Sequence, residues 1–485
     1  MLFNSILFWK FFALLFAVYF FVPQKIKWLF LLLASYFFYG YWKVEYVPLL
    51  ALPTLATYVA ARAMAAARTP VLKKVLLWGG LALTLGLLFV FKYLELFWQT
   101  FLNLQGYLRQ APAKTALTVL LPIGISFFTF RMVSYLVDVY HQRIPAEKHL
   151  GFYALYVAFF PQLLAGPIDR AIRLIPQLKN PVYFDWQRIT SGLKLIIWGM
   201  FKKIVIANRL HFFVTYVFYH PENQGLDLVF AAYFYAFQIY CDFSGYSDMA
   251  VGISRILGFE SMKNFDFPYF SKSISEFWNR WHISLSSWLR DYLFLPLAYA
   301  TMRMIKGEKL LAVKAETWGY FVATFITMLL GGLWHEANWA FVIWGALYGF
   351  YLMSSYISKR LRKKIVKKIG LQRVPWFHSA LSVLLTFNLV SFAWIFFRAE
   401  TFRHALRYIG LIDFYLPDNR SMHLLFNVML LAIFLVIEFF YKNMERIVFW
   451  QRFPRPLKMA AFAFFCCLLI MLAVDKSNEF IYFQF

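Results

Sequence analysis

The sequence predicts an all-α, polytopic integral membrane protein with about eleven to thirteen transmembrane helices. Hydrophobic residues make up 61% of the 485-residue chain, against about 45–50% in soluble domains, and the mean hydropathy is +0.58. Aromatic residues, which are part of that share, make up 22% of the chain, and their rings favour the bilayer core and its two interfaces. These values place most of the chain in a lipid bilayer.

The positive charge is explained by membrane topology rather than by nucleic-acid binding. The formal net charge is +25, but Lys and Arg lie in short loops between apolar runs instead of on one soluble face. The first loop carries Lys25 and Lys27 and the third is rich in basic residues, whereas the second carries only Lys43. Because basic loops stay on the cytoplasmic side, the N-terminus is expected to face outward.

Apolar runs of about 20 residues mark the expected spans. The N-terminal run contains Lys10 and lacks both a basic start and a small-residue cleavage signal, so it is expected to remain as the first helix. No linker or internal repeat divides the sequence, which predicts a single domain over 1–485 with its motif-bearing core at about 116–357. The candidate spans lie near 5–22, 28–46, 47–64, 75–92, 116–140, 150–166, 190–207, 227–250, 319–335, 338–357, 380–398, 423–441 and 458–474.

Two further stretches, 93–112 and 271–304, are too polar or too interrupted to be simple spans. We expect interfacial or partly buried helices there. Pro and Gly beside polar residues also predict helix breaks at LLPIGIS (120–126), FFPQLLAGPIDR (159–170) and LLGGLWH (329–335). A kink or a close helix crossing is the alternative at each of the three.

The segment from Ser275 to Leu293, SEFWNRWHISLSSWLRDYL, places Glu, two Arg, His and Asp among aromatic residues. Ionisable groups at membrane depth are usually functional. Glu276 and Arg280 have the i,i+4 spacing of a helical ion pair, and His282 and Ser286 share the same spacing. Asp291 lies nine residues after His282, on the opposite side of any continuous helix. It therefore acts with His282 only if the helix breaks, and otherwise forms a structural ion pair with Arg290 or a neighbouring helix.

A second polar centre ends an apolar stretch at GGLWH, which delivers His335 to the end of an expected span. Neutral imidazole can accept a proton near neutral pH, so His335 is a candidate general base; a buried histidine that only packs is the alternative. The segment CDFSGYSD adds Asp242, Ser244, Tyr246 and Asp248, which either line the same cavity or form interhelical hydrogen bonds.

Common catalytic signatures are absent. HEANW has no second His at the fourth position, GISFF lacks the second Gly of a nucleophile elbow, and there is no phosphate-binding glycine loop. The sequence therefore predicts no metal site and no bound cofactor.

Five long motifs resemble the membrane-bound O-acyltransferases, and within them the alginate O-acetyltransferase (AlgI-like) branch. The C-terminal EFIYFQF resembles the same branch, so the similarity covers nearly the whole chain. The motifs are LLPIGISFFTF at 120–130, FFPQLLAGPI at 159–168, YCDFSGYSDMAVGI at 240–253, NFDFPYFSKSISEFWNRWHISLSSWLRDYLFLPL at 264–297 and GGLWHEANWAFVIWGALYGFYL at 331–352. Departures are small: Glu336 stands where the branch usually has Gly, and LPLAYA replaces a frequent Gly-Gly-Asn sequence.

The resemblance implies a helical body with a central tunnel, in the bacterial cytoplasmic (inner) membrane. It assigns His335 to the essential histidine of the family, His282 to the second active-site position and Asp291 to the acidic residue of that motif. The other residues expected to support the site or line the cavity are Arg290, Arg280, Trp281, Ser286, Trp334, Asn338, Asp242, Tyr246 and Asp248.

The implied reaction is O-acetylation of an extracytoplasmic polysaccharide such as alginate. Acetyl-CoA would be the cytoplasmic donor substrate, and a separate extracytoplasmic SGNH-type acetyltransferase would complete the transfer. Peptidoglycan O-acetylation and D-alanyl transfer to teichoic acid are alternatives within the family. Outside it, a proton-coupled transporter would use His282 and His335 as a relay, and a scaffold for envelope enzymes would need neither.

Overall fold

The computed structural model describes residues 1–109, 122–222, 225–305, 307–311, 313–413, 422–443, 454–473 and 480–481. Within these ranges the chain is helical apart from connecting segments and one small hairpin, which confirms the all-α prediction. The two strands of that hairpin, β1 (Lys309–Leu310) and β2 (Val313–Lys314), pair antiparallel.

The N-terminal third consists of short and long apolar helices. They are α1 (Ile6–Tyr19), η1 (Gln24–Ile26), α2 (Lys27–Gly40), α3 (Tyr46–Ala66), α4 (Pro70–Leu88), the π-helical turn η2 (Phe89–Tyr93), α5 (Leu94–Arg109), α6 (Ile125–Tyr140), α7 (Leu150–Ala158), α8 (Phe160–Leu163) and α9 (Ala171–Lys179).

The middle third carries most of the sequence motifs. Its elements are α10 (Trp186–Met200), the π-helical turn η3 (Phe201–Ala207), α11 (Asn208–Tyr219), α12 (Asp227–Ile256), η4 (Pro268–Phe270), α13 (Ile274–Arg280), α14 (Ile283–Leu289), the π-helical turn η5 (Arg290–Phe294) and α15 (Leu295–Met304).

The C-terminal third follows the hairpin. It contains α16 (Ala315–His335), α17 (Trp339–Ile357), α18 (Lys359–Lys368), η6 (Leu371–Arg373), α19 (Pro375–Arg398), α20 (Phe402–Gly410), α21 (Met422–Asn443) and α23 (Arg455–Leu472).

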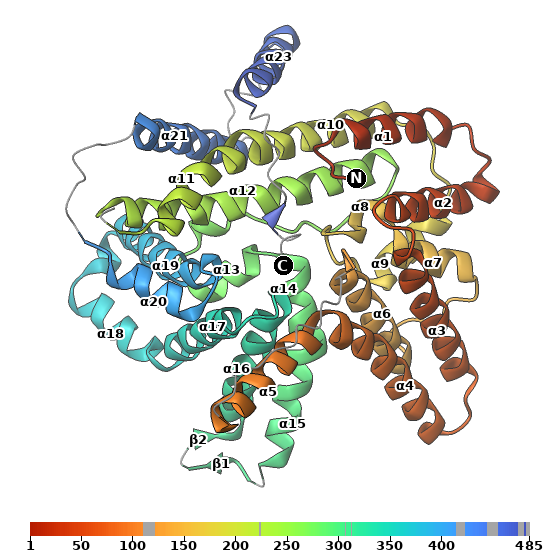
Figure 1. The fold of residues 1–485 in the computed structure, drawn as a ribbon, viewed down its shortest axis with the longest axis horizontal. Helices are drawn as coiled ribbons and strands as arrows, with labels where there is room; N and C mark the ends of the chain where they lie inside the picture. The colour runs from red at the N-terminus through yellow and green to blue at the C-terminus, as the bar shows by residue number, and fades with distance from the viewer. Residues whose placement is uncertain are drawn as a thin grey trace.

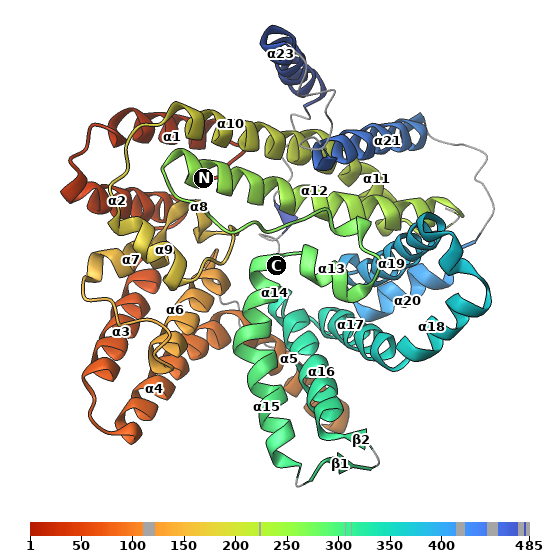
Figure 2. The same ribbon diagram turned by 180° about the vertical axis from the view of Figure 1, so that it is seen from behind.

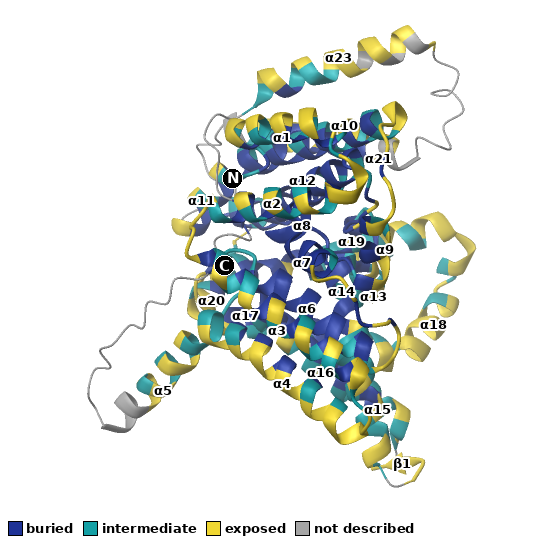
Figure 3. Cartoon of the chain, turned by 90° about the vertical axis from the view of Figure 1, so that its right-hand side faces the viewer, coloured by how far each residue is buried: buried dark blue, intermediate teal, exposed yellow. Residues whose placement is uncertain are grey.

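Long helices meet around a central region. Helices α10 and α12 run side by side, α3 and α4 pack with α6, and α15, α16 and α17 form a third group (Figure 1). The view from behind shows α13 and α14 between these groups (Figure 2). Buried residues concentrate at this centre, around α6, α8, α12 and α14, whereas α18 and α23 are largely exposed (Figure 3).

Five helical segments of the described chain are long and apolar enough to cross a membrane: Tyr46–Ala66, Pro70–Leu104, Ala315–His335, Trp339–Ile357 and Pro375–Arg398. The second joins the expected span at 75–92 to the stretch at 93–112 through the turn η2. Other expected spans form shorter helices, such as Ile6–Tyr19, or helices with more polar residues, such as α12. Part of the expected span at 116–140 lies outside the described residues.

Two of the three predicted helix breaks are present. Helix α6 begins at Ile125 after Gly124, whose φ of +78° favours glycine. Helix α7 ends at Ala158 and α8 ends at Leu163, leaving 164–170 without helix. Residues 120 and 121 of the first motif lie outside the described part.

The buried side chain of Arg131 provides hydrogen-bond donors at the second break. Its guanidinium donates to the carbonyl oxygen of Tyr156 at 2.9 Å and to Oε1 of Gln162 at 2.6 Å. Gln162 donates in turn to Oδ2 of Asp169 at 2.5 Å. Carbonyl groups released at the end of α7 thus find partners inside the protein, as burial away from water requires.

The third predicted break is wrong, because α16 is continuous through Gly331 and Gly332 to His335. A Cβ atom on Gly332 would lie 2.2 Å from the carbonyl oxygen of Phe341 on α17. The glycine there permits a close crossing of two helices, which is the alternative expected for a small residue in a membrane helix.

Candidate active site

His335 is the last residue of α16, and its side chain lines a cavity of about 330 Å³. The rest of the lining combines hydroxyl, amide and guanidinium groups with large aromatic rings. Its residues are Ser275, Trp278, Asn279, Ile283, Leu285, Ser286, Ser287, Leu289, Arg290, Phe294, Tyr320, Thr324, Thr327, Met328, Gly331, Trp344 and Leu352. A buried imidazole therefore faces a space large enough for a small substrate.

Lys92 holds the end of the helix that carries His335. Its ammonium group donates to the carbonyl oxygens of Trp334 at 2.6 Å and of His335 at 3.0 Å. The last carbonyl groups of a helix have no partner within the helix, and a positive charge there also complements the helix dipole. Lys92 thus fixes the backbone at the candidate base.

His282 is fully buried and lies between α13 and α14, where its φ is +43°. Its Nδ1 lies 3.0 Å from Oδ1 of Asn264. That oxygen also accepts from the backbone N–H of Ser284 at 3.3 Å and from the Ser284 hydroxyl at 2.9 Å. The N–H of Ser284 can only donate, so the oxygen of Asn264 must face it, and Nδ1 of His282 must carry the proton. Neutral His282 then has its lone pair on Nε2.

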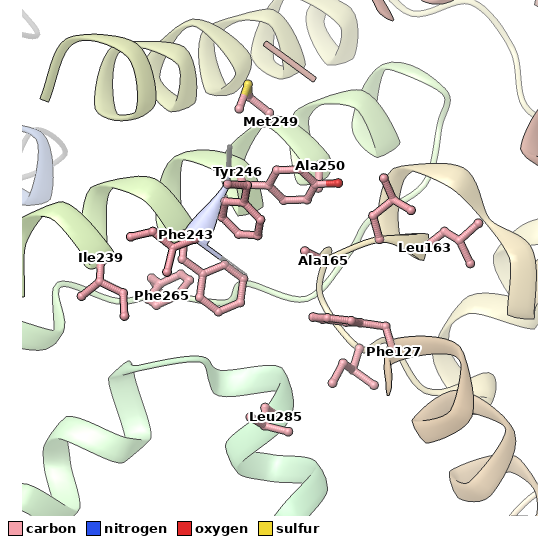
Figure 4. Close-up of a cluster of buried hydrophobic side chains, with 14 of the residues drawn as sticks. Phe127, Leu163, Ala165, Ile239, Phe243, Tyr246, Met249, Ala250, Phe265 and Leu285 are labelled. Atoms are coloured by element: carbon pink, nitrogen blue, oxygen red, sulfur yellow. The ribbon is translucent and has the colours of Figure 1, made fainter. Parts of the chain in front are cut away.

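Aromatic rings surround both histidines. The Trp334 ring lies 5.0 Å from the His335 ring and 6.1 Å from the His282 ring, measured between centroids. Phe243 meets His282 edge-on at 4.6 Å. Phe243 and Phe265 belong to a buried apolar cluster that Leu285 approaches from α14 (Figure 4). This packing buries the His282 ring completely and leaves His335 in contact with the cavity. Electrostatic interactions are stronger in such a poorly solvated environment.

The predicted supporting residues fall into two groups. Arg290 and Ser286 line the cavity together with His335. Asp291 is not among the lining residues: it accepts from Arg290 at 2.9 Å and lies 3.8 Å from Arg170. Helix α14 continues through η5 without a break, so Asp291 does not lie on the same side as His282. Its contacts are those of the structural ion pair, the second of the two roles expected for it.

Three more predicted residues are not among those that line the cavity. Arg280 pairs with Glu276 at 2.6 Å, as their i,i+4 spacing predicts. Trp281 is fully buried, and its ring lies 5.0 Å from that of Trp394. Asn338 caps α17 by accepting from the N–H of Ala340 at 3.0 Å. The expected pair of His282 and Ser286 side chains is replaced by a bond from the Ser286 hydroxyl to the carbonyl oxygen of Trp281, at 3.0 Å.

The CDFSGYSD residues form interhelical contacts and are not among those that line the His335 cavity. Lys203 of η3 pairs with Asp242. Lys202 pairs with Asp248 at 2.7 Å and donates to Ser244 at 2.9 Å. These ion pairs are expected, because buried charged side chains require partners. Of the two roles expected for these residues, the structure shows interhelical contacts and not the lining of the His335 cavity.

The C-terminal part of the chain returns to the same cluster. The backbone N–H of Ile481 donates to Oδ2 of Asp242 at 2.8 Å. The Phe480 ring stacks on that of Tyr246 at 4.8 Å and lies 5.7 Å from Phe243. Apart from Phe480 and Ile481, the C-terminal EFIYFQF motif lies outside the described residues.

Sequence reasoning missed Lys92 and Asn264 as supports of the two histidines. A signal existed for each. Lys92 is an ionisable residue within an apolar run, which is a functional hint in a membrane helix. Asn264 opens the longest of the recognised motifs, but its distance of 18 residues from His282 hides their contact.

Comparison with known proteins shows the family of the chain. Residues 87–399 match the model of the MBOAT, membrane-bound O-acyltransferase family. The chain is 37% identical over 414 residues to the probable alginate O-acetylase AlgI of Pseudomonas putida, covering 84% of this chain and 80% of that protein. It is 34% identical over 413 residues to the peptidoglycan O-acetyltransferase of Helicobacter pylori, covering 78% and 72%.

A third relative transfers a different group. The teichoic acid D-alanyltransferase of Streptococcus thermophilus is 32% identical over 288 residues, covering 57% of this chain and 68% of that protein. The region that matches the family model, residues 87–399, contains Lys92, His282 and His335 and the helices that hold them. The chain belongs to the membrane-bound O-acyltransferase family and is a multi-pass membrane acyltransferase.

Proposed function

We propose that this protein is the membrane subunit of a polysaccharide O-acetylation system in the bacterial cytoplasmic membrane. It moves an acetyl group from cytoplasmic acetyl-CoA toward an extracytoplasmic polysaccharide such as alginate. The observation that carries the proposal is the position of His335. It ends a helix that is long and apolar enough to cross a membrane, and it lines a cavity with hydroxyl and guanidinium groups. The 37% identity to a probable alginate O-acetylase supports alginate as the acceptor class.

His335 acts as the general base in this proposal. Its imidazole takes the proton of an acceptor hydroxyl while the oxygen attacks the thioester carbonyl. The new C–O bond forms, the tetrahedral intermediate collapses, and the C–S bond breaks to release the thiolate, which is then protonated. The guanidinium of Arg290 and the hydroxyl of Ser286, both on the cavity lining, are placed to stabilise the oxyanion, because donors in a water-poor site act strongly on developing charge. His282 is fully buried and is not among the residues that line this cavity. Its ring lies 6.1 Å from that of Trp334, which contacts His335, so in this proposal His282 supports the base from inside the protein.

The cavity dimensions support a short acyl group. A volume of about 330 Å³ is at the small end of the range for small-molecule sites. The lining includes four large aromatic side chains, Trp278, Phe294, Tyr320 and Trp344. Such rings leave room for an acetyl group and restrict a long fatty acyl chain.

An extracytoplasmic SGNH-type acetyltransferase is the proposed partner that completes the transfer. Two other acceptors are second candidates, because relatives with those activities match large parts of the chain. One is peptidoglycan, favoured by the Helicobacter pylori relative. The other is teichoic acid with a D-alanyl group, favoured by the Streptococcus thermophilus relative.

Vesicles that contain the protein and its partner test the proposal. Labelled acetyl-CoA is supplied on one side, and alginate, peptidoglycan fragments or teichoic acid on the other. Label in alginate that depends on the protein supports the proposal. Label only in peptidoglycan, or activity only with a D-alanyl thioester donor, assigns the corresponding alternative. Absence of label in all acceptors, with a folded protein and partner, contradicts acyl transfer from these donors.

A further inference from the structure

A second pocket, of about 430 Å³, lies away from the histidines and is basic. It shares no lining residue with the His335 cavity. Its walls come from the α1–α2 connection and the neighbouring helices α2, α7 and α9, which lie side by side in Figures 1 and 2. The lining includes Lys25, Lys27 and Lys179 but no Asp or Glu. The pocket is therefore complementary to an anion.

Lys27 is the most buried lysine of this pocket. The residue is 5% exposed, and its ammonium donates to the carbonyl oxygen of Val182 at 3.0 Å and lies 4.8 Å from the Tyr19 ring centroid. No carboxylate within the described residues lies within 4 Å of this ammonium. Buried charges normally have a charged partner, so an anionic ligand would supply what the chain does not.

Other donors face the same space. His149 lines the pocket and accepts at Nδ1 from the N–H of Gly151 at 3.1 Å. Its neutral ring therefore carries the proton on Nε2, which can donate to an oxygen anion. Lys179 pairs with Glu147 at 2.6 Å, yet its side chain remains 45% exposed. Ammonium and imidazole donors of this kind suit a phosphate group.

The apolar side of the pocket favours a lipid as the source of that phosphate. Trp28, Leu31, Phe152 and Phe259 line it beside the lysines. Tyr183, Phe184 and Trp186 closely follow the lining residue Val182 in the chain and are exposed. Exposed Tyr and Trp side chains are frequent at membrane interfaces. Basic pockets between membrane helices on the cytoplasmic side bind anionic headgroups, and the basic first loop places this pocket on that side.

We propose that this pocket binds the phosphate headgroup of an anionic phospholipid from the cytoplasmic leaflet, with Lys25, Lys27 and Lys179 around the phosphate. The acyl chains lie along the apolar wall next to Trp28 and Leu31. A bound lipid would tie the α1–α2 connection to α9. The site is separate from acyl transfer and does not depend on which acceptor the enzyme uses.

Native mass spectrometry of the full-length protein in detergent tests this site. The protein is titrated with phosphatidylglycerol or with zwitterionic phosphatidylcholine. The pocket variant combines Lys25→Gln with Lys179→Gln at two exposed lysines. Because Lys179 also pairs with the buried Glu147, the unfolding temperature of the variant without lipid is compared with that of the control. The charge-matched control combines Lys309→Gln and Lys314→Gln on the exposed hairpin. A second readout is the rise in unfolding temperature on adding each lipid.

The parent protein and the hairpin control should bind phosphatidylglycerol in preference to phosphatidylcholine and should gain thermal stability from it. The pocket variant should bind it about fivefold more weakly for each lysine removed. Equal affinity of the pocket variant and the hairpin control overturns the proposal. Displacement of the lipid by millimolar inorganic phosphate or glycerol 3-phosphate, without a preference for phosphatidylglycerol, overturns the lipid source and assigns the pocket to a free phosphate compound.

Discussion

Asn264 decides the proton position on His282. Its amide oxygen accepts from the backbone and hydroxyl of Ser284 and from Nδ1 of His282, while its amide nitrogen donates to the hydroxyl of Ser247 at 3.0 Å. One asparagine thus connects α12, the segment before η4 and the start of α14. It is a positioning residue, because it acts through His282 and is not among the residues that line the cavity.

Replacing Asn264 with Ala should leave buried donors of His282 and Ser284 without their acceptor. Such a loss costs about 1–3 kcal/mol, and we expect acetyl transfer to fall by about tenfold or more as His282 loses its single tautomer and orientation. The rate of transfer and the unfolding temperature are measured together. Asn388→Ala is the matched control, since Asn388 also bonds a side chain, the hydroxyl of Tyr233 at 2.6 Å, on other elements. Equal losses of transfer in both variants would contradict a positioning role for Asn264.

Glu336 follows His335 in the chain and makes the stability of the folded protein depend on pH. Burial raises the pKa of the Glu336 carboxyl from 4.5 to about 7, although Lys92 and Asn338 oppose this shift. The folded state therefore favours the protonated carboxyl. Its contribution to stability is present in full below the ordinary pKa of 4.5 and is lost as the pH rises through about 7.

The unfolding temperature of the parent protein should fall between about pH 5 and pH 8 by more than that of Glu336→Gln, whose amide does not titrate. Differential scanning fluorimetry across this range measures the difference, with Glu316→Gln at an exposed position as the charge-matched control. If the parent and Glu336→Gln had the same pH dependence, the raised pKa would not contribute to stability.

At the scale of elements, three π-helical turns carry the charged groups around the site. The turn η2 holds Lys92, η3 holds Lys202 and Lys203, and η5 holds Arg290 and Asp291. A π-helical turn adds one residue to a helix and redirects the side chains that follow, and such turns are frequent at functional sites. In each case the redirected residue bonds a neighbouring element or lines the cavity.

Lys92→Met should loosen the end of α16, because the carbonyl oxygens of Trp334 and His335 lose their donor. We expect a loss of about 1–3 kcal/mol in stability, and faster amide hydrogen exchange in residues 331–337 than in the rest of α16. Hydrogen exchange with mass spectrometry measures this directly. Lys10→Met, at an exposed position on α1, serves as control, and exchange in 331–337 that matches this control would show that Lys92 does not hold the helix end.

The crossing of α10 and α12 positions Lys202 and Lys203 against their partners. A Cβ atom on Gly245 would lie 2.6 Å from the carbonyl oxygen of Gly199. Gly245→Ala should therefore force the helices apart and destabilise the protein by about 1–3 kcal/mol. Gly86→Ala should be neutral or stabilising by up to about 1 kcal/mol, since nothing lies within 4 Å of the added methyl group. Unfolding temperatures of the two variants check both, and equal stability would argue against close packing at Gly245.

At the scale of the whole molecule, composition and hydropathy are sufficient to predict a helical membrane body. They do not determine which apolar runs become long helices. The run at 150–166 is cut by Pro161, and the run at 227–250 becomes a helix whose polar groups, such as Asp242, require partners on η3. Whether such a helix is long or broken depends on contacts that the sequence pattern does not contain.

The position of His335 on the cavity was predictable from the sequence, whereas the contacts that support the two histidines were not. His335 ends an apolar helix, and local sequence reveals that position. Asp291 and the CDFSGYSD residues also have local signals, but their ion pairs with Arg170, Lys202 and Lys203 arise from distant segments. Spacing along one helix cannot identify such partners. The same holds for the contact of Lys92 with residues more than 240 positions away.

The role of His335 as general base is tested most directly by the rate of labelled acetyl transfer from acetyl-CoA in vesicles that contain the protein and its partner. The rates of the His335→Ala and His220→Ala variants are compared. His220 is exposed and lies outside the cavity. We expect His335→Ala to remain folded and to lose about 10²–10⁴-fold of the transfer rate, because a general base has been removed. His220→Ala should remain active. Transfer by His335→Ala at the rate of the His220→Ala control would contradict the assignment of His335 as the base.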